Sequence, residues 1–543
     1  MKRNETEVLN GQTLFQDPEL NKDTAFTAGE RKEYHIDGLL PAIIETIDDQ
    51  VKRVNMQLSI KPNDLERYIY LVSLQERNET LFFKVLMTDP ARFVPIVYDP
   101  TVGEACSKFS HIYRQKAGMY LTIKDKGRVK EILENWPVND IRFICVSTGG
   151  RILGLGDLGS NGMGIPIGKL QLYTACAAIP PEPLLPLLLD CGTDNEDLLK
   201  DPFYIGLRQH RPSTAELDEF VAEFVEAVQE VFPKCCIHFE DWKGTDAIRL
   251  LKKYRNEVLC YNDDIQGTGA VALAGLIGAL RISGEKLTDQ RILFFGAGSA
   301  AIGIANMIGA AMRLDGLAEN QMHDQIALFD INGLLVDART DLSEEQKVYS
   351  KLLPLTRDLV AAIEALRPTV IIGVSTAGKS FTQNVIEAMS EINERPIIFA
   401  LSNPTDHAEC TAEEAYNWSN GQAIYAAGVQ FDTVNFKGKT FYPGQANNFY
   451  LFPGVSLAIY AAQPRHITDE LWIEAAKTLA NLVRPDELSK GMVFPPQGNI
   501  LELSTAVAAH VAAVVFDRKL TDCPRPPDIK NWISNMQYQP GYH

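Results

Sequence analysis

Two pairs of adjacent carboxylates are the residues in this chain best suited to chemistry. Glu240 and Asp241 follow the apolar run "CCIHF", and Asp263 and Asp264 follow "LCYN" further along the chain. If both runs are strands, their ends bring the four acids together, and a hard divalent cation such as Mg²⁺ or Mn²⁺ would relieve the repulsion between them. The spacing alone is equally consistent with four solvated loop acids.

Lysine and tyrosine are the candidate base and acid, because the nine histidines form no cluster. Lys169 lies in "MGIPIGKLQLYTACAAI", where burial would lower the pKa of its ammonium group towards the range useful for a base. Tyr98 ends the apolar run "FVPIVY", which we interpret as a strand before a proline turn. The alternatives are a lysine at a helix start whose ammonium group reaches solvent, and a core tyrosine without chemistry.

Two glycine-rich segments compete as the dinucleotide site. Residues 154–159, "GLGDLG", match the fingerprint G-x-G-x-x-G, but Gly162, Gly164 and Pro166 follow, so we expect no helix directly after the third glycine. A bound pyrophosphate needs the free N–H groups of a helix N-terminus. "GAGSAAIG" lies between the apolar run "RILFF" and a helical pattern, so it is the predicted site. The alternative is a tight turn without a ligand.

The predicted cofactor contacts follow from that strand, turn and helix. Gly296 and Gly298 allow a tight turn and the close approach of phosphate, and Ala301 allows close helix packing. The turn residues expected at the cofactor are Gly296, Gly298, Ser299, Ala300 and Ala301. The next predicted strand, "QIALFD", ends in Asp330, whose carboxylate can accept hydrogen bonds from the adenosine ribose. Because Asp330 lies beyond the usual spacing of about 20 residues, we expect a longer helix or loop before it.

Three kinds of segment must position these residues. Residues from about 39 to 116 show the three- and four-residue spacing of helices. Strands such as "IRFICVST" and "PLLPLLLDCG" follow, and from "RILFF" to "AIYAAG" strands alternate with helices, which indicates a parallel, doubly wound sheet. The predicted fold class is α/β, with a Rossmann-type NAD-binding domain, a second α/β lobe and a helical N-terminal domain.

Composition narrows the partners. The formal net charge of −18 argues against a nucleic acid or an anionic membrane surface. The first ten residues resemble neither a secretory signal nor a transit peptide, so we expect a cytoplasmic protein. The longest apolar stretch, from Lys169 to "LLLDCG", contains four prolines, so we expect no membrane-spanning helix. The nine cysteines lack C-x-x-C spacing, which argues against a zinc or disulfide framework.

Taken in order, segments from nearly the whole chain resemble the malic enzymes. The matching segments are "IVYDPTVGEAC", "RILGLGDLGSNGMGIPIGKLQLYTACA", "CGTDNEDLLKDPFYIGLRQHR", "HFEDW", "YNDDIQGTGAVALAG", "GAGSAAIG", "ALSNPT" and "PGQANNFYLFPGV". The resemblance implies oxidative decarboxylation of L-malate to pyruvate and CO₂, with reduction of NAD and dependence on Mn²⁺ or Mg²⁺. It also implies that "GLGDLG" belongs to the substrate lobe.

The resemblance assigns roles to the residues singled out above. Lys169 would be the base that takes the C2 hydroxyl proton, with Asp263 beside it, and Tyr98 the acid that protonates the enolate. The implied metal ligands are Glu240, Asp241 and Asp264. The implied substrate contacts are Arg151, Asn403 and Asn447, of which Arg151 and Asn403, together with Asp264, also border the cofactor.

The choice of dinucleotide rests on the end of the second strand. Asp330 would repel the 2′-phosphate of NADP, and the next residues, Ile331 and Asn332, offer no cation. By the resemblance, Gln346 stands where NADP-using relatives tend to have lysine, although Lys347 is adjacent. NAD is therefore the expected cofactor, with NADP as the alternative.

Two rival functions remain at this point. Malolactic enzyme shares the fold and cofactors but releases lactate, and its pattern differs around Arg151. A non-catalytic nucleotide-binding regulator should have lost an ionisable group among Tyr98, Lys169, Asp263 and the metal acids, and all are present. The sequence therefore favours a malic enzyme.

The predicted domains are residues 1–116, helical; 117–263 with 448–519, the substrate lobe; 264–447, the NAD-binding domain; and 520–543, a C-terminal extension over another surface. By the resemblance we expect a homodimer or homotetramer. Arg53 and Arg77 match positions that form a dicarboxylate activator site in some relatives. The alternative is two solvated arginines on helices.

Overall fold

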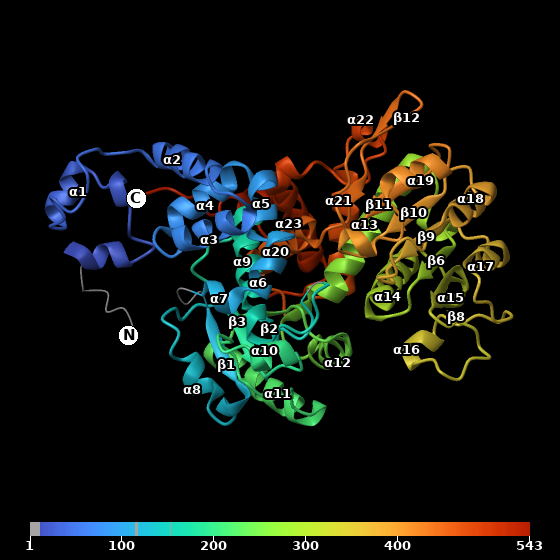
Figure 1. Cartoon of the computed structure of the whole chain (residues 1–543), viewed down its shortest axis with the longest axis horizontal. Helices are drawn as coiled ribbons and strands as arrows, with labels where there is room; N and C mark the ends of the chain where they lie inside the picture. The colour runs from blue at the N-terminus through green and yellow to red at the C-terminus, as the bar shows by residue number, and fades with distance from the viewer. Residues whose placement is uncertain (1–10, 114–117, 153, 543) are drawn as a thin grey trace.

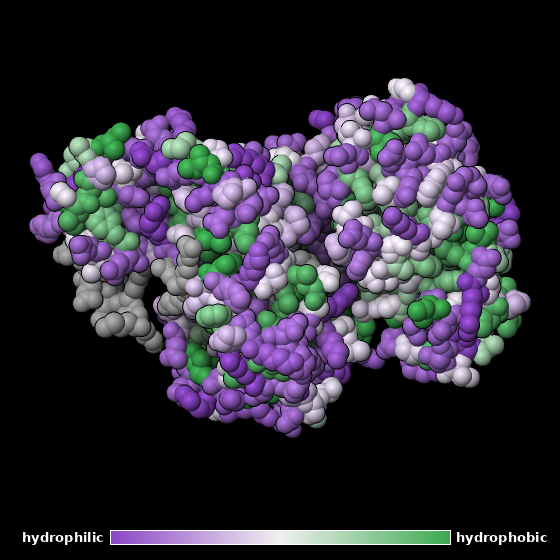
Figure 2. Space-filling model, viewed as in Figure 1, coloured by the Kyte–Doolittle hydropathy of each residue, from purple (hydrophilic) through white to green (hydrophobic). Residues whose placement is uncertain are grey.

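The computed structural model of the chain describes residues 11–113, 118–152 and 154–542. Figure 1 shows N-terminal helices in blue, a first sheet below the centre, a second sheet in yellow and orange, and C-terminal helices in red between them. In Figure 2 hydrophilic residues cover most of the same face. The predicted α/β fold class, with a Rossmann-type sheet and a helical N-terminal region, is confirmed.

The described part of the chain before the first strand is helical. Its elements are η1 (Gly11–Gln16), η2 (Asp23–Ala25), α1 (Ala28–Glu33), α2 (Ile47–Ser59), α3 (Asp64–Gln75), α4 (Glu79–Thr88), α5 (Pro90–Val97), α6 (Thr101–Ser107) and α7 (Phe109–Ile112). A polar side chain caps the start of each helix from α2 to α5 by accepting a backbone hydrogen bond: Thr46, Asn63, Asn78 and Asp89. The predicted helical residues 114–116 lie outside the described residues.

The predicted strand ending at Tyr98 is wrong, because "PARFVPIV" forms helix α5 and Tyr98 follows it as the C-cap. Asp89 accepts a hydrogen bond from the Arg92 N–H, and Pro90 occupies the first helical position, where no N–H is needed. These two start signals outweigh the strand-like appearance of the apolar run.

The first sheet is parallel, in the order β1-β3-β2-β4-β5. Its strands are β1 (Met119–Thr122), β2 (Phe143–Ser147), β3 (Leu184–Asp190), β4 (Cys236–Phe239) and β5 (Cys260–Asn262). The connecting helices are η3 (Ile123–Asp125), α8 (Val129–Leu133), η4 (Gly159–Met163), α9 (Gly164–Ala177), α10 (Glu196–Lys200), α11 (Thr214–Val231) and α12 (Gly244–Tyr254). Neighbouring residues of β2 enter two different apolar clusters, so both faces of the sheet are buried.

A helix does begin at the third glycine of "GLGDLG", contrary to the sequence prediction. The 3₁₀ turn η4 starts at Gly159 and leads into α9, where Pro166 falls in the first turn and so removes no needed N–H. All of η4 is buried, and the Tyr204 hydroxyl accepts the Ser160 N–H at 2.9 Å. A phosphate is excluded there by burial rather than by the lack of a helix.

The second sheet has the order β14-β11-β10-β9-β6-β7-β8, and every neighbouring pair is parallel except β7 with β8. Its strands are β6 (Ile292–Phe295), β7 (Ile326–Asp330), β8 (Gly333–Leu334), β9 (Val370–Gly373), β10 (Ile397–Ala400), β11 (Ile424–Ala427) and β14 (Gly444–Gln445). Strands β12 (Val434–Phe436) and β13 (Lys439–Phe441) form a separate antiparallel pair. The crevice where the strand order reverses lies beside β6, which carries the predicted cofactor turn.

Helices cover both faces of the second sheet (Figure 1). They are η5 (Asp263–Gly267), α13 (Thr268–Ser283), η6 (Leu287–Asp289), α14 (Ser299–Leu314), α15 (Glu319–Gln325), α16 (Glu344–Lys347), α17 (Leu359–Leu366), α18 (Gln383–Ile392), η7 (Thr405–His407) and α19 (Ala412–Trp418). The extra helix α15 between α14 and β7 explains the long spacing between the glycine turn and Asp330.

The C-terminal helices pack against α9 and α13 in the largest apolar cluster. They are η8 (Asn448–Tyr450), α20 (Phe452–Ala462), α21 (Asp469–Asn481), α22 (Pro485–Leu488), η9 (Gln497–Asn499), α23 (Ile500–Asp517) and α24 (Ile529–Ser534). The tail then reaches the N-terminal helices, where the Tyr542 hydroxyl donates to Gln50 at 2.7 Å and accepts from Asn78 at 2.8 Å.

Two described helical stretches, Asp263–Ser283 and Gln497–Asp517, have the length and apolar composition of a membrane span. In their most apolar windows, 72% and 56% of the residues are buried inside the protein. Core helices pass the same test, so this is weak evidence for a membrane span. The first sheet lies within residues 117–263 and the second within 264–447, while the domain boundaries themselves stay a prediction.

Candidate active site

Lys169 lies at the centre of the candidate site. Every residue of α9 is buried, and the Lys169 side chain is only 2% exposed, so its ammonium group does not reach solvent. Its Nζ lies 2.9 Å from Glu240 Oε1 and forms a closer ion pair with Asp263 Oδ2. Burial lowers the pKa of Lys169, but these two carboxylates outweigh burial and hold the pKa well above its usual value. The expectation that burial would bring the pKa of Lys169 down to the range useful for a base is therefore wrong.

Lys169 lines a cavity bounded by residues from both sheets. Most of the predicted catalytic, substrate and metal residues line this cavity: Tyr98, Arg151, Lys169, Glu240, Asp241, Asp264, Asn403 and Asn447. Ala300 of the glycine turn lines it as well. Asp263 is fully buried beside Lys169. The cavity therefore joins the acidic cluster to the predicted cofactor turn.

The carboxylates converge because β4 and β5 are neighbours in the first sheet and each ends directly before an acidic pair. Glu240, Asp241 and Asp264 each offer an oxygen, and these oxygens lie within 4.8 Å of one another. Glu240 and Asp241 are 3% and 6% exposed, which excludes freely solvated loop acids at these positions. Asp241 Oδ2 is buried without a hydrogen-bond partner among the described residues. This arrangement fits a hard divalent cation.

The electrostatics of the cluster also favour a cation. Burial, followed by the charge of neighbouring carboxylates, raises the pKa of Asp264 to about 7 and that of Asp241 well above its usual value. Burial also raises the pKa of Glu240 to about 8, although Lys169 opposes this. One ammonium group stands against four carboxylates, so all four can ionise together only when a further cation joins them.

The turn η5 separates the two consecutive aspartates. Asp263 pairs with Lys169, whereas Asp264 Oδ2 accepts the Asp241 backbone N–H at 2.8 Å. The turn is π-helical, and a Cβ atom at Gly267 would lie 1.8 Å from Asp263 Oδ1. Glycine is therefore required for this turn to close over Asp263.

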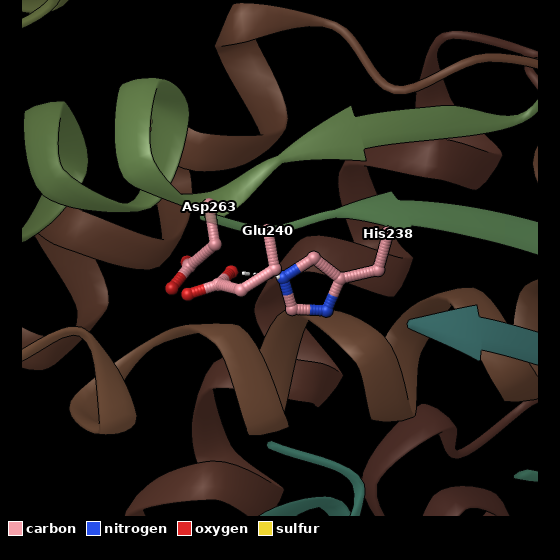
Figure 3. A group of neighbouring side chains, drawn as sticks. All are labelled: His238, Glu240 and Asp263. Atoms are coloured by element: carbon pink, nitrogen blue, oxygen red, sulfur yellow. Dashed lines mark hydrogen bonds and ion pairs between the residues drawn. The ribbon is translucent and has the colours of Figure 1, made fainter. Parts of the chain in front are cut away.

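A second group, His238, Glu240 and Asp263, lies beside the first (Figure 3). The His238 Nε2 lies 2.7 Å from Glu240 Oε2, and burial lowers the pKa of His238 to about 3, so the ring is neutral. The ammonium group of Lys169 already bridges Glu240 and Asp263, which favours the Asp241 group for a metal. His238 was not predicted from the sequence, although it stands two residues before Glu240, the spacing that directs side chains of an extended chain to the same side.

Tyr98 and Asn447 approach the cavity from different elements. The Tyr98 ring centre lies 5.4 Å from Lys169 Nζ, and burial raises the pKa of the Tyr98 hydroxyl well above its usual value. Asn447 Nδ2 donates to the neighbouring Asp99 at 3.4 Å. Sequence analysis missed Asn448, whose Nδ2 donates to the Asp263 carboxylate at 3.1 Å. The position of Asn448 directly after Asn447 is the feature of the sequence that could have indicated it.

Arg151 lies on a turn held in place by "GLGDLG". Its backbone N–H donates to the Asp241 carbonyl at 3.3 Å, and its side chain is exposed. Asp157 accepts hydrogen bonds of 2.8 Å from Arg211, which also donates to the Thr148 carbonyl at 2.9 Å. This ion pair fixes the segment that presents Arg151 to the cavity.

The glycine turn after β6 leaves the start of α14 open. Gly296 has a φ of +123°, and a Cβ atom there would lie 2.7 Å from the Val374 carbonyl oxygen. A Cβ atom at Gly298, the N-cap of α14, would meet no atom within 4 Å. Ser299 and Ala300 form the partly exposed first turn, and Ala301 is buried. The free N–H groups of this open helix start suit a pyrophosphate.

The end of β7 carries a cation that sequence analysis missed. Arg339 donates hydrogen bonds of 2.8 Å to both carboxylate oxygens of Asp330 and also pairs with Asp341. The Gln346 side chain donates to the Ala297 carbonyl at 2.9 Å, which places α16 beside the glycine turn. Lys347, also on α16, pairs with Glu344 at 2.6 Å.

Arg53 and Arg77 do not line the cavity. Arg53 on α2 pairs with the buried Glu45. Arg77 follows α3 and lines a surface hollow with Lys61, Glu66 and Tyr70. The activator site implied by the resemblance stays untested, as does the alternative of two solvated arginines.

A doubly wound parallel sheet with an open glycine turn is typical of dinucleotide-dependent oxidoreductases. Comparison with known families is consistent with this class. The family described as "Malic enzyme, N-terminal domain" matches residues 75–255, and "Malic enzyme, NAD binding domain" matches residues 265–516. The chain is 45% identical over 535 residues to the NADP-dependent malic enzyme of Rattus norvegicus, covering 98% of this chain and 94% of that protein. The chain belongs to the malic enzyme family.

Further relatives agree with this membership. The NADP-dependent malic enzyme of Sus scrofa is 46% identical over 535 residues, covering 98% of this chain and 96% of that protein. The solved malic enzyme of Entamoeba histolytica shares the fold, with a TM-score of 0.57, 20% identity, and coverage of 93% of this chain and 91% of that chain. The expectation of an NAD-dependent enzyme is wrong, because these full-length curated relatives are named as NADP-dependent.

Proposed function

We propose that the protein is an NADP-dependent malic enzyme, which converts L-malate to pyruvate and CO₂ with reduction of NADP. The observation that carries the proposal is the Lys169 ammonium group, buried between Glu240 and Asp263 at a cavity that also reaches Asp264 and Ala300. Proton transfer, metal binding and hydride transfer would thus share one cavity.

Glu240, Asp241 and Asp264 would hold the divalent metal, which would supply Lewis acidity at the C2 oxygen of the substrate. Lys169 would take the C2 hydroxyl proton as hydride leaves C2 for the nicotinamide. Because its ion pairs hold Lys169 protonated, it must first release a proton, and Asp263 Oδ2 is the adjacent acceptor. Asp263 would thus act together with Lys169 as one proton-transfer unit.

Tyr98 would donate its hydroxyl proton to C3 after CO₂ has left, and it would regain a proton from the neighbouring Lys169 ammonium group. Burial keeps its hydroxyl protonated, so a proton is available for the enolate. Arg151, Asn403 and Asn447, which line the cavity, would bind the carboxylates and the C2 oxygen of malate, and Arg151, Asn403 and Asp264 would border the cofactor as well. These assignments use only groups that line the same cavity.

Use of NADP is supported by the named relatives and by two cations, one at the end of β7 and one on the helix beside the glycine turn. Arg339 compensates the charge of Asp330, and Lys347 lies on α16 beside the glycine turn. Guanidinium and ammonium groups are the usual partners of a phosphate. A 2′-phosphate therefore has positive charge available close to the ribose position.

The deciding experiment supplies purified protein with L-malate and Mn²⁺, in parallel with NADP and NAD. Reduced cofactor is followed by absorbance, and pyruvate and lactate are both assayed. Pyruvate in equal amount to NADPH, with NADP preferred, supports the proposal. Lactate without net cofactor reduction would identify a malolactic enzyme instead.

A further inference from the structure

His238 is a fully buried histidine that the proposed reaction does not use. Its Nε2 lies 2.7 Å from Glu240 Oε2, and its Nδ1 lies 2.9 Å from the Tyr173 hydroxyl and 3.1 Å from the Tyr261 hydroxyl. Figure 3 shows the ring of His238 directed at Glu240, whose carboxylate faces Asp263. The histidine thus links a tyrosine pair to a predicted metal ligand.

The chemistry of the partners fixes the direction of these hydrogen bonds. A carboxylate that binds a cation is ionised and only accepts, so in the metal-bound state the proton of the neutral His238 ring must sit on Nε2. Nδ1 then accepts a hydrogen bond from a tyrosine hydroxyl. Only one tautomer satisfies both sides of the ring, and this tautomer donates to Glu240.

The ring is also held sterically. It stacks on Tyr261 with 4.4 Å between ring centres and an interplanar angle of 26°, and on Tyr173 at 6.0 Å and 14°. The Tyr261 hydroxyl lies 3.0 Å from Ser456 Oγ on α20. Side chains from α9, β5 and α20 therefore fix the orientation of the His238 ring and the direction of its N–H group.

We propose that His238 is a positioning residue for Glu240, an inference that rests on the proposed metal-dependent function. Glu240 Oε1 faces Lys169 and Oε2 accepts from His238, so the rotation of the carboxylate about its terminal bond is fixed from both sides. Each oxygen keeps a further lone pair for a cation held with Asp241 and Asp264. Without His238, Glu240 can turn towards Lys169 with both oxygens and leave the cation.

The test measures Mn²⁺ binding directly, by electron paramagnetic resonance titration of the protein without substrate or dinucleotide. His238→Leu removes the donor and keeps an apolar side chain, and should weaken Mn²⁺ binding about 10- to 100-fold. His238→Gln keeps an N–H donor and should stay within a few-fold of wild type. Tyr261→Phe is the matched control, because it keeps the stacked ring and leaves Tyr173 to donate to Nδ1.

Kinetics supply a second readout. The KM for Mn²⁺ should rise in His238→Leu, while kcat at saturating Mn²⁺ should fall much less, because Lys169 and Asp263 remain in place. Thermal melting of each variant reports folding separately. If His238→Leu does not fold, the double variant Tyr173→Phe/Tyr261→Phe replaces it, since it leaves Nδ1 without a donor and should also weaken Mn²⁺ binding.

The possible failures can be told apart. If the wild-type protein does not bind Mn²⁺, or if Asp264→Asn binds it as well as wild type does, the proposed metal site itself fails. If wild type binds Mn²⁺ and folded His238→Leu binds it equally well, the positioning role is overturned. If His238→Gln loses as much affinity as His238→Leu, an N–H donor at this position does not hold Glu240, which also overturns the positioning role.

Discussion

Arg339 donates one hydrogen bond of 2.8 Å to each carboxylate oxygen of Asp330. At the end of β7, the prediction from the sequence weighed only Asp330 and the two residues directly after it, and so expected a 2′-phosphate to be repelled there. The guanidinium group, nine positions further along, pairs with Asp330 and with Asp341, so Asp330 is not an isolated negative charge at this corner of the second sheet. The prediction of NAD from Asp330 alone therefore left out a neighbouring cation.

Lys347→Gln should raise the KM for NADP about tenfold, because about 1.4 kcal/mol of charge-assisted hydrogen bonding to phosphate would be lost. The KM for NAD should stay unchanged. Lys477→Gln removes an ammonium group that pairs with Asp315, outside the cavity, and serves as the control. An equal rise in KM for both dinucleotides would contradict the assignment of Lys347.

Lys169→Ala should lower kcat for malate oxidation by at least 10²-fold, the usual contribution of a positioned acid or base. The affinity for NADP, measured by fluorescence titration, should stay near that of wild type, since Lys169 lies among the carboxylates and not in the glycine turn. Substantial remaining turnover in a folded variant would remove Lys169 from the role of base.

Asp264→Ala should lose metal-dependent activity that excess Mn²⁺ does not fully restore. The variant removes one of three converging carboxylates and leaves the Asp241 N–H without its acceptor. Glu257→Ala, an acid on the loop before β5, provides the control. A titration of activity against Mn²⁺ that matches wild type would refute Asp264 as a ligand.

The metal-free protein should become less stable as the pH rises from about 5 to about 8. Glu240, with a pKa raised to about 8, and Asp264, with a pKa raised to about 7, keep their protons in the folded state after the unfolded chain has released them. The stability that these protons supply is lost as the pH passes the raised values. Melting temperature should fall by several degrees over this range.

Mn²⁺ should recover that stability most strongly at high pH, because it then replaces the lost protons without competition. Melting curves with and without Mn²⁺ at pH 6 and pH 8 check both statements. Stability that rises with pH in the metal-free protein would show that the carboxylates are not protonated as proposed.

Glu409→Gln should raise the KM for dinucleotide several-fold and lower the melting temperature. The buried carboxylate accepts hydrogen bonds from the Ser375 N–H and hydroxyl at 3.1 Å and from the Ser402 N–H at 3.3 Å, so it ties the ends of β9 and β10 together at the cavity. An amide would place N–H groups against some of these donors. The exposed Glu413→Gln is the control. Unchanged dinucleotide binding would limit Glu409 to a role in folding.

Five strands of the second sheet, β6, β7, β9, β10 and β11, were predictable because each apolar run is short and ends in a turn, whereas the two-residue edge strands β8 and β14 were not predicted. "FVPIVY" was wrongly predicted to be a strand because all but one of its residues before Tyr98 are apolar in appearance. The signals that start the helix, Asp89 and Pro90, come before the run. The convergence of acids at the ends of β4 and β5 could be predicted, because both runs were recognised as strands that end in acidic pairs. The raised pKa of Lys169 could not be predicted, since it depends on Asp263, which is distant in the chain. The same applies to Tyr173 and His238, which meet only through packing.

The turn η5 limits which substitutions and insertions this protein can accept. It gives two neighbouring aspartates separate partners, Lys169 for Asp263 and the Asp241 backbone for Asp264. Losing or gaining one residue there would exchange or misalign the two, and any side chain at position 267 would collide with Asp263. In a library of random variants, residues 263–267 should therefore be among the least tolerant of substitution, and insertions should survive only outside this segment.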